Sequence, residues 1–533
     1  MLELSPGSVS IPPRMSFWPA ITSWLQRNRT SARMAFVWRM VAMVLGSFFS
    51  LLWWRLLLHA MGAPLYGLFL LFQAVTRLGG LGDFGITGAL GLQTGTMLGR
   101  KDESGLRQLL ASARTLFLLI AGGLCVLFWV LSPWLPKWLG FESIPGAGSM
   151  TWLFVYGGLS LAVMIVSGYF ACLNYAHGTV TWPIFPTLFL TQALAPFFHW
   201  RLALLQMPLW IQLMPYLGST IIVTFLGWRM LKWSHPWLGN LRPLLHDTVQ
   251  WKSLAGASWW IYLITVGTLI YFTTDRLVIG AVMGTDVIPK YQANYKACEL
   301  LVTVIVTAAF VGFPKINQWI SSPDQGDRKR LLMELNRLSI FEVVLGSGAV
   351  LGYILFNDLF VRLWLGQAYQ APLAWQFAFA ANLAVTVSGN AGIQVSTRAG
   401  DKGLKLAGTV AAGTGLLNLA LSLLSVKLGS ITGVAVATVI AQSLSSIFLG
   451  TITCRYLGLS TVPWVARCWL LPMVLTLAAA GLKELFPRES VADFSILTAC
   501  FAILFLLVCR LAGFTIEMLR AEVAQIRRMI GLA

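Results

Sequence analysis

Apolar runs long enough to cross a lipid bilayer recur along this chain from about Met34 to Ala512. A hydrocarbon core of roughly 30 Å needs about 20 apolar residues in a helix, and about 14 such runs can be laid out here. Charged residues make up only 11% of the sequence, and no water-soluble core uses so much apolar sequence. The sequence therefore predicts an all-α, polytopic membrane protein.

Lysine and arginine are distributed unequally between the two sides of these runs. The chain carries 38 of them against 20 acids, for a net charge of +18. When the loops are assigned to alternate sides, 25 lie on the side of the amino terminus, 7 on the other and 6 inside the runs. Short loops rich in Lys and Arg stay in the cytoplasm, so we predict that both termini are cytoplasmic. This placement assigns the basic excess to topology and to anionic membrane lipids, rather than to a nucleic acid.

Cysteine and histidine form no recognisable cluster. The seven cysteines are scattered, mostly within or beside apolar runs, and none belongs to a CxxC pair. The five histidines do not gather around them. The sequence therefore predicts no disulfide framework, no metal site and no cofactor, and we expect no enzymatic activity.

A faint internal repeat divides the chain into two similar parts. The stretch RLLLHAMGAPLYGLF starts at Arg55, and RLVIGAVMGTDVIPKYQA starts at Arg276. In each, Met-Gly precedes a tyrosine, Tyr66 or Tyr291, that opens the next span. Parallel repeats are a recurrent transporter plan, and chance similarity between apolar segments is the alternative. We predict a cytoplasmic segment 1–33, an N-lobe of six helices over 34–231, a linker 232–253, a C-lobe of six helices over 254–453, two extra helices over 467–512 and an amphipathic cytoplasmic tail 513–533.

Residues that break helices gather in three of the predicted spans, namely 65–92, 180–199 and 207–231. The first of these is rich in glycine and the other two in proline. Clustered in this way they permit the bending that alternating access requires, and close packing without motion is the alternative.

Ionisable residues inside the spans are the candidates for function, because each costs about 2.5 to 3.5 kcal/mol at mid-bilayer. Arg77 falls near the middle of the second span, and we predict that it lines a central hydrated cavity; a buried ion pair is the alternative. Asp83 follows six residues later, a spacing that does not share a helical face with Arg77. Arg39 and Arg55 fall near opposite ends of the first span, where long side chains reach the interface. Arg114 is expected to do the same.

The second half of the chain carries further charges. Asp275 and Arg276 are neighbours, so we expect them to point about 100° apart and not to share one groove. Lys296 and Glu299 have the spacing of an ion pair on one helical face. Glu342 is expected at the interface.

The tenth span, 373–397, adds the amides Asn382, Asn390 and Gln394, a polar stripe that suits a cavity wall. Six basic residues lie inside the spans against few acids, and a positively lined cavity of low dielectric attracts an anion. Arginine forms paired hydrogen bonds with phosphate oxygens. The residues therefore indicate a substrate with an anionic head that bears phosphate.

Two stretches resemble a known family. YGLFLLFQAVTRLGGLGDFGITGAL, from Tyr66 to Leu90, is similar to the second span of bacterial polysaccharide flippases of the O-antigen type. TDRLVIGAVMGTDVIPKYQANYKACELL, from Thr274 to Leu301, resembles their seventh and eighth spans. These flippases belong to the multidrug/oligosaccharidyl-lipid/polysaccharide exporter superfamily.

The resemblance implies a protein of the bacterial inner membrane with 14 helices in two six-helix lobes around a cationic cavity. It implies movement of undecaprenyl-pyrophosphate-linked oligosaccharide to the periplasmic leaflet, for O-antigen, capsule or exopolysaccharide synthesis, with a polysaccharide polymerase as a candidate partner. The cavity cations of the family would correspond to Arg77, Arg276 and Arg55. Asp83 would match the acid of its second span, and Asp83 or Asp275 is the candidate for coupling a proton or cation.

Two alternatives remain open at this stage. A cation-coupled multidrug antiporter of the same superfamily would need a cavity rich in acids, whereas this one is basic. A membrane glycosyltransferase or O-antigen polymerase would need charged catalytic residues in a sizeable periplasmic loop. The longest predicted outer loops, 132–149 and 359–372, carry few acids.

Overall fold

All regular structure in the described part of the chain is helical. The computed structural model describes residues 32–100, 102–139, 149–176, 187–234, 248–309, 319, 325–396, 400–486, 491–518, 520 and 524. Within these residues there is no β-strand, and each predicted span falls wholly or partly on a helix. The predicted fold class, a polytopic all-α membrane protein, is confirmed.

The first half of the chain forms a set of long helices joined by short connections. Its elements are α2 (Ala32–Gly79), η1 (Gly80–Asp83), α3 (Ile86–Arg100), α4 (Glu103–Leu131), α5 (Leu135–Leu139), α6 (Met150–Ala176), η2 (Leu188–Leu194), α8 (Ala195–Leu204) and α9 (Leu209–Ser234). Helix α2 contains the first predicted span and much of the second, with a kink at Gly62, where φ is 74°. The two limbs of α2 therefore run as separate spans.

The second half of the chain is likewise built of helices, most of them joined by short connections. Its elements are α10 (Thr248–Met283), α11 (Ile288–Ala309), α13 (Gln325–Leu365), η4 (Gln367–Tyr369), α14 (Leu373–Ser388), α15 (Asn390–Ser396), α16 (Gly400–Lys427), α17 (Ile431–Leu457), α18 (Thr461–Val465), η5 (Ala466–Leu470), α19 (Leu471–Leu485) and α20 (Val491–Ala512). The predicted amphipathic segment at 16–29, most of the linker and most of the tail lie outside the described residues.

Nine helices in the described residues are long and apolar enough to cross a membrane, or ten when the two bent limbs of α10 count as one span. The predicted number is larger because α2 holds two predicted spans, and because some inner helices are short or polar. Helix α14, for example, has 16 residues, of which most are buried. It is apolar but, with its 16 residues, shorter than the helices that qualify as membrane spans.

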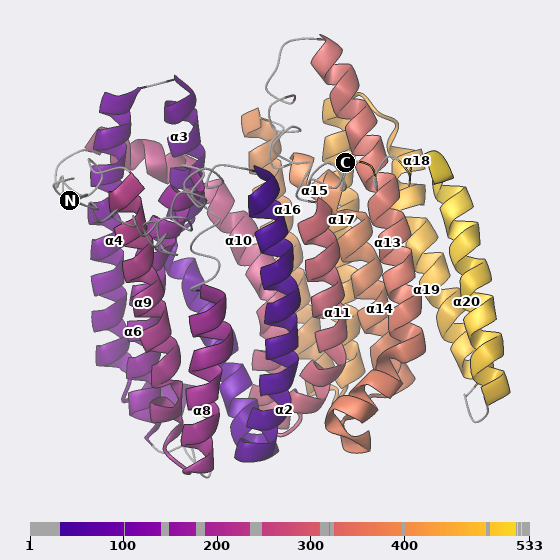
Figure 1. The fold of residues 1–533 in the computed structure, drawn as a ribbon, viewed down its shortest axis with the longest axis horizontal. Helices are drawn as coiled ribbons and strands as arrows, with labels where there is room; N and C mark the ends of the chain where they lie inside the picture. Colours follow the sequence, from indigo (N-terminus) through magenta and orange to yellow (C-terminus); the bar gives the residue numbers. More distant parts are fainter. Residues whose placement is uncertain are drawn as a thin grey trace, which may run out of the picture.

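The helices stand side by side with roughly parallel axes (Figure 1). Those of the first half, from indigo to magenta, gather on one side of the view, and those of the second half, from orange to yellow, on the other. Helix α20 lies at the far edge of the second group. This arrangement is compatible with two lobes, and the exact lobe boundaries remain a prediction. We call the end of the bundle at which α2 begins the inner end and the opposite end the outer end, after the predicted orientation.

The two groups are packed directly against each other. At the outer end, the indole N–H of Trp364 in α13 donates to the Leu51 carbonyl of α2 at 2.9 Å. In the second limb of α2, a Cβ added to Gly67 would lie 1.7 Å from the Thr285 carbonyl oxygen. Only glycine allows that backbone approach. The two segments that carry the faint sequence repeat therefore touch in the folded chain.

The second predicted span is broken, as its glycines indicated. Helix α2 gives way to the 3₁₀ turn η1, and the backbone has positive φ at Phe84 (51°) and Gly85 (75°) before α3 begins. The Asp83 carboxylate accepts the Gly85 N–H at 2.9 Å, which satisfies a donor that the break exposes. A Cβ on Gly85 would lie 2.6 Å from the Ser258 carbonyl oxygen of α10, so this break is another contact between the two halves.

Candidate functional site

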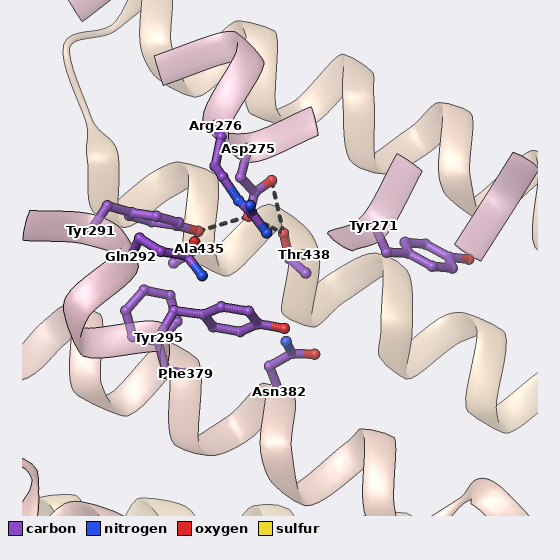
Figure 2. A pocket seen from close by; sticks show the side chains of 10 residues that line it. All are labelled: Tyr271, Asp275, Arg276, Tyr291, Gln292, Tyr295, Phe379, Asn382, Ala435 and Thr438. Atoms are coloured by element: carbon purple, nitrogen blue, oxygen red, sulfur yellow. Dashed lines mark hydrogen bonds between the residues drawn. The ribbon is translucent and has the colours of Figure 1, made fainter. Parts of the chain in front are cut away.

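A polar pocket lies inside the second group of helices, where α10, α11, α14 and α17 meet. About 330 Å³ of empty space, open solvent included, lies among its lining residues. Figure 2 shows the residues that line it, which are Tyr271, Asp275, Arg276, Tyr291, Gln292, Tyr295, Phe379, Asn382, Ala435 and Thr438. The pocket therefore combines an acid and a base with hydroxyls, amides and aromatic faces.

Asp275 is the acid among the described residues that line this pocket. Only 8% of the residue is exposed. The Tyr291 hydroxyl donates to Asp275 Oδ2 at 2.7 Å, and Thr438 Oγ1 lies 3.1 Å from the same oxygen and 3.3 Å from Oδ1. Hydrogen bonds of this kind stabilise a carboxylate in a buried site.

More acceptors than donors surround the Thr438 hydroxyl. Its oxygen is also 3.2 Å from Asn418 Oδ1 and 3.4 Å from the Val434 carbonyl oxygen. One hydroxyl proton serves only one of these oxygens at a time. Nearby on α16, Asn418 Nδ2 and Ser422 Oγ are buried without a hydrogen-bond partner. The Asn418 amide nitrogen is itself a donor, so the shortage of donors concerns only the oxygens around Thr438. These oxygens are chemically suited to a proton or a small monovalent cation.

Arg276 lines the same pocket as Asp275, and it is only 4% exposed. The expectation that the two side chains could not share one groove is wrong. Their Cα–Cβ bonds diverge, but the long arginine side chain turns toward Thr438, as Figure 2 shows. The two limbs of α10 also meet at 46° next to this point, between Tyr271 and Thr273. Arg276 is close enough to Tyr66 in α2 to act on it electrostatically, so its influence reaches the first half of the chain.

Aromatic side chains form one wall of the pocket. Tyr291 and Tyr295 lie one turn apart on α11, and each packs on Phe379 of α14, with ring centroids 5.1 Å and 5.4 Å apart. Between them, Gln292 is 3% exposed and its Oε1 has no hydrogen-bond partner. An unsatisfied buried amide oxygen is costly and marks a position where a ligand or water donor would be favourable.

The other predicted charged site residues with described side chains do not line this pocket. The backbone of Arg77 belongs to the second limb of α2, and its side chain, like that of Arg39, lies outside the described residues. Arg55 is exposed on α2 and does not line the Asp275 pocket. Asp83 is half-buried at the break before α3 and caps that turn. The structure thus brings together Asp275 and Arg276, but neither Arg55 nor Asp83 joins them.

The polar stripe of the tenth span is divided between two places. Asn382 lines the pocket, but the helix breaks at Gly389, between α14 and α15. Beyond that break, Asn390 Nδ2 donates to Glu342 Oε1 at 2.8 Å. Gln394 is half-buried on α15 and does not line the pocket.

Glu342 is fully buried rather than interfacial, which corrects its predicted position. Only 2% of it is exposed, and its Oε2 accepts the Ala391 N–H at 2.9 Å. A carboxylate from α13 therefore caps the first turn of α15, where free N–H groups attract negative charge. The predicted pair of Lys296 and Glu299 is confirmed, with Nζ 3.0 Å from Oε2.

Sequence reasoning missed the oxygen ligands around Asp275. Thr438 and Asn418 are uncharged residues in apolar runs, and attention to ionisable groups alone passes over them. The available signal was positional, because Asn418 and Ser422 are four residues apart on one helix and so share a face. Only the packing of α10 against α16 and α17 could show that this face meets Asp275.

Comparison with solved structures identifies the fold. The lipid II flippase MurJ in an inward closed conformation matches 89% of this chain and 97% of its own, with a TM-score of 0.64 and 14% identity. A MATE transporter in complex with MaL6 matches 81% of this chain and 98% of its own (TM-score 0.57, 11% identity). The Vibrio cholerae MATE transporter VcmN in the bent form matches 83% and 98% (TM-score 0.54, 11% identity).

The chain has the fold of these transporters. At this level of identity the likeness concerns the fold and not the substrate. The sequence matches no protein-family profile and no curated protein at a significant level. The likeness to MurJ and the MATE proteins concerns the fold, and the expectation of an O-antigen flippase is taken up below.

Proposed function

We propose that this protein is a flippase for undecaprenyl-pyrophosphate-linked oligosaccharide in the bacterial inner membrane, with both termini in the cytoplasm. It would work by alternating access and supply O-antigen, capsule or exopolysaccharide synthesis, with a polysaccharide polymerase as a candidate partner. The observation that carries the proposal is the buried arginine of α10, Arg276, in a fold shared with a lipid II flippase.

The charge and place of Arg276 suit a phosphate-bearing substrate. A guanidinium group in a low-dielectric site attracts an anion strongly and binds phosphate through paired hydrogen bonds. Arg276 lies near Tyr66 of α2, next to the close contact between Gly67 and Thr285. An anion held by Arg276 and by Arg77 would therefore be sensed by both halves of the chain.

The coupling step is assigned to Asp275. The Thr438 hydroxyl lies within hydrogen-bond distance of both the Asp275 carboxylate and Asn418 Oδ1. Binding of a proton or monovalent cation there changes the charge beside Arg276, and so changes how firmly Arg276 holds an anion. Asp83, which caps the break in the second span, is the weaker candidate because its described hydrogen bond is local.

A cation-coupled multidrug antiporter is the second candidate. The MATE transporters share the fold, and a buried acid such as Asp275 is a plausible partner for a cationic drug. The neighbouring Arg276 disfavours this reading, because a cation in the pocket would meet a positive charge.

The test is the distribution of undecaprenyl-pyrophosphate oligosaccharide between the two leaflets in a strain that lacks the protein. We expect it to accumulate in the cytoplasmic leaflet. The wild-type protein should restore export, whereas Arg276→Ala and Arg77→Ala should not. Arg362→Ala provides the matched control, because Arg362 is an exposed arginine of α13 outside the pocket.

Membrane levels of each variant must match the wild type, so that loss of export reports on transport. Export by the Arg276→Ala protein at the wild-type rate would refute its role in substrate binding. Normal translocation with altered drug resistance would favour the antiporter. Unpolymerised units accumulating in the periplasm would instead indicate a polymerase.

A further inference from the structure

A second pocket lies in the first half of the chain, apart from the Asp275 pocket. About 280 Å³ of empty space, open solvent included, lies among its lining residues. The polar or aromatic part of this lining comes from Arg114 of α4, Tyr169 and Phe170 of α6, and Trp228 and Lys232 of α9. None of its described lining residues is acidic. Nothing in the proposed transport cycle uses this pocket.

The pocket lies where membrane spans end. The apolar span of α6 ends at Leu173, and that of α9 ends at Arg229. Trp228 therefore lies at the end of an apolar span, and Lys232 lies just beyond it. Tryptophan gathers at the headgroup level of membranes, and lysine extends its ammonium group toward the water there. With the predicted orientation, this level is the cytoplasmic leaflet.

The cations of the pocket are positioned by aromatic rings. Lys232 Nζ lies 5.5 Å from the centroid of the Trp228 ring, within the range of a cation–π contact. Arg114 is half-buried and close enough to Tyr169 to act on it electrostatically. The Tyr169 hydroxyl itself donates to the Leu110 carbonyl at 3.1 Å. The cationic groups that line the pocket are the Arg114 guanidinium and the Lys232 ammonium, and a guanidinium carries five N–H donors, more than one partner uses.

An apolar face continues from the pocket toward the membrane centre. Phe225 is 55% exposed, and its ring centroid is 5.6 Å from that of Trp228. Ile221 and Ile222, one turn further along α9, are about half exposed. Lys232 lies at headgroup level, and Arg114 lines the same pocket from within the α4 span, which begins at Ser104. A basic pocket followed by exposed apolar side chains at acyl-chain level matches the two parts of a phospholipid.

We propose that this pocket binds the phosphate of an anionic phospholipid of the cytoplasmic leaflet. The phosphate lies between Arg114 and Lys232, and an acyl chain lies along Phe225. Basic pockets between membrane helices on the cytoplasmic side are recognised sites for lipid headgroups. The apolar face favours a lipid over free phosphate, which has nothing to place there.

The experiment is native mass spectrometry of the full chain in detergent, titrated with dioleoylphosphatidylglycerol and, separately, with dioleoylphosphatidylcholine. The test variant is Arg114→Gln with Lys232→Gln. The matched control is Lys405→Gln, which changes an exposed lysine near the start of α16, outside the pocket. A charge-preserving variant, Arg114→Lys with Lys232→Arg, shows whether binding follows charge, and thermal unfolding confirms that each variant is folded.

We expect phosphatidylglycerol to bind the wild type at least 10-fold more tightly than phosphatidylcholine. The double glutamine variant should lose this preference, while the control and the charge-preserving variant should keep it. Wild-type affinity in the double glutamine variant would overturn the proposal. Displacement of the lipid by millimolar inorganic phosphate would show a simple anion site and would also overturn it. Tenfold tighter binding of undecaprenyl pyrophosphate than of phosphatidylglycerol would do the same, by assigning the pocket to the substrate.

Discussion

At the scale of single residues, adjacent charges of opposite sign share one small buried pocket. Asp275 and Arg276 are both less than 10% exposed, and burial of either alone is expensive. Hydroxyls from Tyr291 and Thr438 reach the acid. This arrangement lets a single bound cation or proton alter the charge that an anionic substrate meets.

Asp275→Asn should abolish the coupling of transport to a cation or proton without removing the arginine that binds the anionic substrate. The amide has the shape of the carboxylate but not its charge, so a cation or proton is no longer held, while Arg276 remains. We expect at least a 10-fold loss of gradient-driven transport in proteoliposomes, tested with a proton gradient and a sodium gradient in turn. Thr438→Ser keeps the hydroxyl and should behave as the wild type. Undiminished gradient dependence in Asp275→Asn would exclude Asp275 as the coupling residue.

A second buried charge holds an added helix in place. Lys483 of α19 is 8% exposed; its Nζ lies 2.7 Å from Asp358 Oδ2 in α13 and 2.6 Å from Gln376 Oε1 in α14. The Ile354 carbonyl of α13 is a third acceptor, at 2.9 Å. Lys483→Ala would remove the donor that all three acceptors share, and hydrogen bonds to charged groups contribute roughly 1.5–3 kcal/mol each. We expect a clear drop in the thermal unfolding temperature in detergent.

Lys405→Ala, at an exposed position of α16, is the comparison for that measurement. It removes a lysine without removing a buried partner, so its unfolding temperature should stay near that of the wild type. An unchanged unfolding temperature in Lys483→Ala would show that the α13–α19 contact does not depend on this pair.

At the scale of elements, the contact between the halves depends on glycine. Gly67→Ala places a Cβ where the Thr285 carbonyl oxygen lies 1.7 Å away, so α2 and the turn after α10 must separate. We expect lower thermal stability and greater labelling of a cysteine placed at Thr285. Gly123→Ala on α4, where nothing lies within 4 Å of the added Cβ, should neither lower the thermal stability nor increase the labelling, because alanine is favoured over glycine inside a helix. Equal behaviour of the two variants would contradict the close contact.

At the scale of the whole molecule, orientation follows from the distribution of basic residues. A cysteine at Gln367, exposed in the turn after α13, should react with a membrane-impermeant maleimide in intact cells. One at Lys402, exposed near the start of α16, should react only after the membrane is permeabilised. The protein without an added cysteine is the control, because it shows how much label its native cysteines take up. The opposite pattern would show that the predicted topology is inverted. The second pocket, lined by Arg114 and Lys232, would then face the other leaflet.

The sequence alone determined the class of fold. About 20 apolar residues cross a bilayer wherever they occur in a chain, so the runs predicted helices without knowledge of their neighbours. The glycines of the second span likewise indicated the break at η1, because a helix weakens locally at such residues. The Lys296–Glu299 pair depended only on spacing along one helix.

Tertiary structure decided the site. Asp275 gains its oxygen neighbours from α11 and α17, and Asn418 of α16 completes the cluster only because these helices pack together. The stripe of the tenth span was divided by the break at Gly389, which directed Asn390 to Glu342 instead. Contacts such as that between Asp275 and Thr438, which are 163 positions apart, depend on which helix faces meet. Periodicity identifies an apolar or polar face, but the partner of that face is chosen by the packing of the whole bundle.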